Sequence, residues 1–153
     1  MAILHELDST AVYYDKVWKT AVRDKFCRKL EDIEKKDNLF FSQYWQGFAW
    51  AAIIGFLNNR RIPLESKSKE SSFKYGVIMR QSSIIADALL LMAIAKSGMG
   101  DELLEKPTEL VAIISEYATG GAIIINEIRD TPEKEIMFNY PDDYLSEIED
   151  RLK

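Results

Sequence analysis

Apolar residues recur at spacings of three or four along most of this chain, which is the pattern of amphipathic helices. From Tyr14 to Ile33 such a stripe alternates with lysine and arginine, and it predicts a first helix. The segment "KKDN" ends this stripe, and Asp37 or Asn38 offers a side-chain oxygen that can cap a second helix. The second helix is expected to run to about Leu57. It is apolar on nearly every face, as expected of a central helix.

Two further helices have clear start and stop signals. The third can begin at Ser82 or Ser83, and it ends at "KSGMG", where Gly98 suits the left-handed conformation that follows many helices. Pro107 fits the first turn of a fourth helix, because the N–H groups of that turn have no partner within the helix. The apolar stripe that follows predicts a long helix that ends near Asp130.

The segment "YPDDYLSEIEDRL" predicts a short fifth helix. It begins at Pro141, and Asp142 and Asp143 fall in the first turn, where the helix dipole favours negative charge. Three apolar residues then share one face: Leu145, Ile148 and Leu152.

These segments predict an all-α fold, a single compact helical bundle of about five helices over residues 1–153. No period of repeat length recurs, which argues against a solenoid. The polar stretch "ESKSKESS" has the composition of a solvated loop within one domain. Residues 1–12 and this loop, 65–72, are expected to be mobile.

Gly120 and Gly121 lie inside the apolar stripe of the fourth helix, where each costs about 1 kcal/mol relative to alanine. We expect them to allow another helix, most plausibly the aromatic second helix, to pass close to the backbone. The alternative is that they divide the segment into two helices. The uninterrupted stripe from Leu110 to Ile128 favours a continuous helix.

Composition and charge place the chain among globular proteins of the cytoplasm. It is 47% apolar and 29% charged, and its net charge of -5 disfavours general affinity for nucleic acid. The charge is uneven, because residues 60–80 hold six basic and two acidic side chains, whereas 127–153 hold nine acidic and four basic ones. One cysteine excludes an intramolecular disulfide, and "MAILHELDST" lacks the pattern of an export signal.

No cluster of residues in the sequence predicts a reaction. His5 is the only histidine, which excludes a multi-histidine metal site, and Cys27 falls on a helical stripe typical of a packed, structural thiol. The acidic pairs lack the spacing by which helical bundles hold two metals, and "SGMGDE" is better explained as a helix cap than as a phosphate loop. We therefore expect no catalytic residue, no metal and no cofactor.

Arg60 and Arg61 are the main candidates for binding. They follow the expected end of the second helix, where cations interact favourably with the helix dipole. Together with Lys67, Lys69 and Lys74 they can also bind phosphate oxygens, the acidic surface of another protein, or the acidic tail of another copy. We expect both roles: the arginines cap the helix and present at least one guanidinium to a partner.

Four segments, in this order and spacing, resemble a known family: "FAWAAIIGFLNNRRIPL", "SSFKYGVIM", "ADALLLMAIAKSG" and "ISEYATGGAIIINE". They are similar to the small proteins associated with DNA phosphorothioation (Dnd) systems, which are encoded beside bacterial sulfur-modification and restriction genes. The likeness covers Phe48 to about Glu127. It implies an accessory protein of the bacterial or archaeal cytoplasm that takes part in defence against phage.

The residues and the resemblance together predict a non-enzymatic interaction protein. We expect it to dock on, or to regulate, a larger defence protein such as an ATPase or a DNA-processing protein. The alternative is a small nucleic-acid-binding module that uses the basic residues between 60 and 80. A homo-oligomer is possible, and no association with a membrane is expected, because the longest apolar run is too short to span a bilayer.

Overall fold

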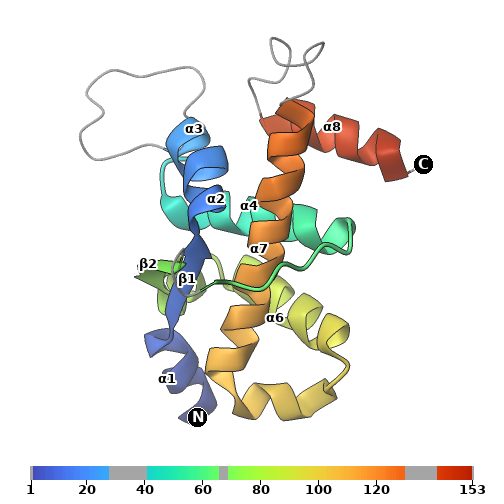
Figure 1. Cartoon of the computed structure of the whole chain (residues 1–153). Coiled ribbons are helices and arrows are strands. Elements are labelled where there is room, and N and C mark those ends of the chain that lie inside the picture. Colours follow the sequence, from blue (N-terminus) through green and yellow to red (C-terminus); the bar gives the residue numbers. More distant parts are fainter. Residues whose placement is uncertain (1, 28–40, 66–68, 130–140, 153) are drawn as a thin grey trace.

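The described part of the chain is mostly helical, with one small sheet (Figure 1). The computed structural model describes residues 2–27, 41–65, 69–129 and 141–152. Its elements are α1 (Ala2–Ser9), β1 (Ala11–Asp15), α2 (Lys16–Trp18), the π-helix η1 (Lys19–Arg23), α3 (Asp24–Phe26), α4 (Tyr44–Leu57), β2 (Lys69–Lys74), α5 (Tyr75–Gln81), α6 (Ser83–Ser97), the 3-10 helix η3 (Gly100–Glu105), α7 (Pro107–Arg129) and α8 (Pro141–Leu152). The predicted all-α class is confirmed.

The central helix is α7, and the prediction that gave this place to the second helix is wrong. In Figure 1, α7 runs through the middle of the molecule, and it contacts α4, β1, α6 and η3. Of the described helices it is the one that is long and apolar enough to cross a membrane, but 72% of its most apolar stretch is buried inside the protein. That burial is typical of the core helix of a folded domain.

The expected first helix begins later than its apolar stripe. Val12 and Tyr14 are buried side chains of the strand β1, and helical structure starts at Lys16. Asp15 ends the strand and caps the helix, because its carboxylate accepts a hydrogen bond from the backbone N–H of Val17 at 2.9 Å. Cys27 is extended again, and the expected helical positions beyond it lie outside the described residues.

A wide helical turn keeps the stripe of this segment on one face. Trp18, Val22 and Phe26 are spaced by four residues, a period that drifts around an ideal helix of 3.6 residues per turn. The π-helix η1 lies between them, and the N–H of Asp24 bonds to the carbonyl of Lys19. This wider turn matches the period of four, and all three side chains are buried.

The second helix, α4, begins at Tyr44 rather than near Asp37 or Asn38. Phe41 instead forms a short parallel bridge with Cys27, and its N–H donates to the carbonyl of Phe26. The side chain of Gln46 then accepts from the N–H of Gln43, as in a capping box. Phe41, which the apolar pattern assigns to the second helix, therefore pairs with the end of the first segment instead.

Two segments that were expected to be mobile have regular structure. Residues 2–9 form α1, in which Leu7 is buried, and Lys69–Lys74 form β2. The prediction of a loop over 65–72 is thus wrong for its second half, because β2 pairs with β1 in an antiparallel sheet. The pairing has an irregularity between Val12 and Tyr13, so the register of β2 shifts by one residue there.

The remaining helices follow their predicted signals. The side chain of Ser82 caps α6 by accepting from the N–H of Ile85, and Gly98 after its end has a φ of 75°. Pro107 begins α7, and Pro141 begins α8. These boundaries confirm the third, fourth and fifth helices.

Candidate functional site

The segment after α4 turns sharply and crosses the face of α7 (Figure 1). Asn59 has a φ of 55°, and the N–H groups of Asn59 and Arg60 bond to the carbonyls of Phe56 and Gly55. These are the two bonds of a Schellman motif, which satisfies the last carbonyls of a helix. The end of α4 is therefore capped by backbone groups, and the prediction that the arginine side chains cap it is wrong.

Both guanidiniums bind carboxylates of α7. Arg60 makes a two-bond pair with Glu127, with N–O distances of 2.9 and 3.0 Å. Arg61 donates from Nε and Nη2 to one oxygen of Glu116, at 3.2 and 3.0 Å. The Arg60 and Arg61 side chains are 39% and 40% exposed, so these pairs add little to stability. Their main effect is to fix the direction of each guanidinium.

The two acceptors share one side of α7. Glu116 and Glu127 are eleven positions apart, which is close to three helical turns. Each guanidinium uses two of its five N–H groups on its glutamate, so other donors can still meet the carboxylate or phosphate of a partner. We name Arg60, Arg61, Glu116 and Glu127 the arginine face.

The other predicted binding residues lie in other parts of the chain than the arginine face. Lys67 lies outside the described residues, and Lys69 is in β2. Lys74 is exposed and immediately precedes α5. Arg80, which is also basic, holds Asp8 of α1 with two bonds of 2.8 and 3.0 Å.

Glycines bring α4 and α7 together beneath the arginine face. A Cβ atom added to Gly121 would lie 1.8 Å from the carbonyl oxygen of Ala51, and one added to Gly55 would lie 2.0 Å from that of Tyr117. Gly120 faces the carbonyl oxygen of Arg60 at 2.0 Å by the same measure. α7 is continuous through both of its glycines, so the alternative of two helices is wrong. The backbones of both helices meet where side chains are absent.

Four residues of this arrangement were not predicted from the sequence: Glu116, Glu127, Gly55 and Asn59. Asn59 carried a usable signal, because asparagine tolerates the left-handed conformation that ends a helix. The glutamates carried none, since they lie 55 and 67 positions from their arginines.

Cys27 is buried between the first segment and α4, beside Gly47. Burial raises the pKa of its thiol from 9.0 to about 12, although a hydrogen bond from the backbone of Gly47 partly opposes that shift. A thiol that stays protonated and buried is a poor nucleophile.

We expect the Cys27 thiol to react with Ellman's reagent at pH 8 roughly a thousand times more slowly in the folded protein than in urea, because the raised pKa lowers the thiolate fraction by about that factor. The pKa is raised in the folded state, so this contribution to stability is complete below about pH 9 and is lost as the pH rises towards 12. Equal labelling rates with and without urea would contradict the burial.

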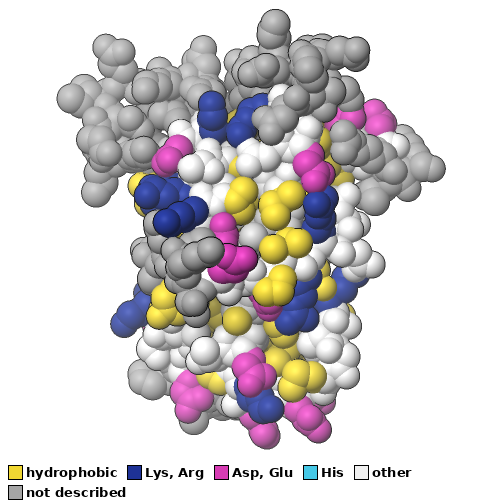
Figure 2. Space-filling model, in the orientation of Figure 1, with side chains coloured by type: hydrophobic (Ala, Val, Ile, Leu, Met, Phe, Trp, Pro, Cys, Tyr) yellow, Lys and Arg dark blue, Asp and Glu magenta, His cyan; other side chains and the backbone are white. Residues whose placement is uncertain are grey.

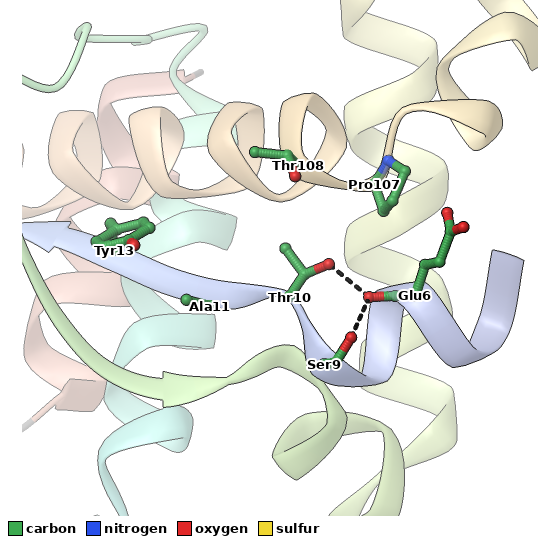
Figure 3. A pocket seen from close by; sticks show the side chains of 7 residues that line it. All are labelled: Glu6, Ser9, Thr10, Ala11, Tyr13, Pro107 and Thr108. Carbon is green, nitrogen blue, oxygen red and sulfur yellow. Dashed lines mark hydrogen bonds between the residues drawn. The ribbon is translucent and has the colours of Figure 1, made fainter.

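A separate hollow of about 440 Å³ lies between the end of α1, β1 and the start of α7 (Figure 3). The hydroxyls of Ser9 and Thr10 both donate to the carbonyl of Glu6, which holds the wall together. The lining residues are Glu6, Ser9, Thr10, Ala11, Tyr13, Pro107 and Thr108. Glu6 is the one ionisable carboxylate among them, and no three His, Cys, Asp or Glu side chains of the described residues gather as a metal site.

Comparison with known proteins identifies the family of this chain. No curated protein and no solved structure matches the chain. A family model described as DNA sulphur modification system-associated protein 4 matches residues 19–139, which include the arginine face and the glycines beneath it. The match extends beyond Phe48 and Glu127, and it confirms the resemblance to proteins associated with Dnd systems. Because it covers most of the sequence, the chain belongs to the family of DNA sulphur modification system-associated protein 4.

Proposed function

We propose that this chain is a non-enzymatic accessory protein of a DNA sulphur modification system, which docks on or regulates a larger protein of that system in the cytoplasm. The family supports the setting, since its members are associated with such systems. The observation that supports docking is the arginine face, where two half-exposed guanidiniums are held in fixed directions by Glu116 and Glu127. Fixed arginines lose little side-chain entropy when a partner binds.

The surface charge favours a protein partner over a nucleic acid. Figure 2 shows basic and acidic side chains interspersed along the middle of the face seen in Figure 1, without a broad basic field. Arg60, Arg61 and Arg80 all bind carboxylates of the chain itself. Affinity for nucleic acid needs an excess of positive charge along the contact surface, so the basic module is the less favoured function.

Swapping charges within the arginine face tests this function. Arg61→Glu combined with Glu116→Arg keeps the ion pair within the chain but turns the positive group of the loop negative. We expect the swapped protein, purified from its native host, to recover at least about ten times less of the other sulphur-modification proteins, because a close charge pair across an interface is lost. Mass spectrometry of the co-purified proteins measures the recovery.

The matched control is the swap of Arg80→Glu with Asp8→Arg, which exchanges a similar exposed pair between α5 and α1. It should leave recovery unchanged. Equal recovery by both swaps and the unaltered chain would overturn the proposal. Fluorescence anisotropy with labelled DNA is measured in parallel, and a salt-dependent affinity that only the Arg61 swap removes would favour the nucleic-acid function instead.

A further inference from the structure

Four apolar residues are exposed along the outward side of α6. Ile84 and Leu91 are 81% and 66% exposed, the highest values among the large hydrophobic residues of the described chain. Ala88 and Ala95 are exposed on the same side, while Ala86, Leu89, Leu90 and Ala93 are buried against the core. In Figure 1, α6 lies at the lower right edge of the molecule.

The spacing of this face is that of a helix-pairing seam. Single exposed apolar residues are normal on protein surfaces. The four residues Ile84, Ala88, Leu91 and Ala95 are instead spaced by four, three and four positions, as are the core positions of a coiled coil. Between Ile84 and Ala95, Asp87 is the one charged side chain of α6. We name these four residues the α6 seam.

We propose that the α6 seam binds the same seam of a second copy, with the two α6 helices antiparallel. The spacing reads the same in both directions, so a two-fold axis between Leu89 and Leu90 places Ile84 opposite Ala95 of the other copy and Ala88 opposite its Leu91. Each layer then joins one large and one small side chain. A parallel pair would set Ile84 against Ile84 and alanine against alanine, which packs unevenly.

The charge of the α6 seam and the small area of the contact are those expected of a weak association between two copies. The seam has no lysine or arginine between Ile84 and Ala95, so two copies meet through apolar groups with Asp87 at the flank. A helix of this length spans only about 22 Å, and the contact is therefore smaller than the roughly 800 Å² per partner of a standard interface. We therefore expect a weak dimer that dissociates on dilution, with a Kd on the order of 10 μM.

Pairs of introduced cysteines test the orientation. In the protein carrying Ile84→Cys and Ala95→Cys, oxidation should give a covalent dimer, whereas Ile84→Cys alone should not. The two positions are about 16 Å apart along one helix, too far for a bond within a single chain. A dimer formed by Ile84→Cys alone would overturn the antiparallel arrangement. The native thiol of Cys27 does not interfere, since it is buried.

Sedimentation of the full chain tests the dimer itself. The unaltered protein should shift from monomer to dimer over about 1 to 100 μM, and Leu91→Gln should stay monomeric throughout. Leu57→Gln is the matched control. Leu57 is likewise an exposed leucine, with 50% of its surface accessible, but it lies at the end of α4. A monomer at every concentration without cross-linking would overturn the proposal, and loss of another sulphur-modification protein on Leu91→Gln would then assign the seam to that protein.

Discussion

Gly121→Ala is expected to lower the free energy of unfolding by about 3 kcal/mol, the upper end of the usual range for overpacking. The added Cβ would lie 1.8 Å from the carbonyl oxygen of Ala51 and 2.7 Å from its carbonyl carbon. Both atoms belong to the backbone of α4, so relief requires the two helices to separate. Urea denaturation followed by circular dichroism measures the loss.

The control for this prediction is Ala95→Gly on the exposed side of α6. It is measured below about 1 μM protein, where the proposed dimer is dissociated. Under that condition it reports helix propensity, and it should cost about 1 kcal/mol. If Gly121 met no obstacle, its replacement by alanine would stabilise the protein by a similar amount. A denaturation midpoint above that of the unaltered protein would therefore contradict the close crossing of α4 and α7.

The helices with local signals were predictable from the sequence. Ser82 and Gly98 mark the two ends of α6, and proline begins both α7 and α8. Each of these signals acts within one turn of the helix it delimits, so the sequence contains all the information that is needed. The apolar stripe of α7 likewise indicated a helix that continues through Gly120 and Gly121.

The sheet and the start of the chain could not be predicted in this way. β2 has the sequence "KESSFK", which is too polar to indicate a strand, and it becomes one because β1 pairs with it from more than fifty positions away. That pairing in turn removes Tyr14 from the expected first helix. Short strands depend on their partners more than helices do.

The arginine face shows the same division between local and distant information. The sequence placed Arg60 and Arg61 at the end of the second helix, which is correct. Their acceptors, Glu116 and Glu127, could be found only once the crossing of α4 and α7 was known. The glycines permit this crossing, and Gly120 lies directly against the backbone carbonyl of Arg60, so the close packing adjoins the arginine face. Close packing and surface chemistry thus lie side by side in this family member.

Tyr144→Ala is expected to detach α8 from the rest of the protein. Tyr144 is fully buried, and its ring meets those of Phe26 and Trp50 edge to face at 5.7 and 6.0 Å. Removing a buried aromatic ring costs about 3 to 5 kcal/mol, and a helix as short as α8 has little stability without its packing. We therefore expect faster hydrogen exchange at the α8 amides and a loss of helical signal.

Glu149→Ala is the control variant, because it changes a residue of α8 without removing a buried side chain. Glu149 is exposed in the last turns of α8, and alanine is a strong helix former, so exchange at the α8 amides should stay slow in this variant. In Tyr144→Ala, exchange in α7 should remain close to that of the unaltered protein, because the central helix is held by α4, α6 and β1. Protection of α8 that survives Tyr144→Ala would show that Ile148, the other described buried side chain of α8, is enough to hold the helix in place.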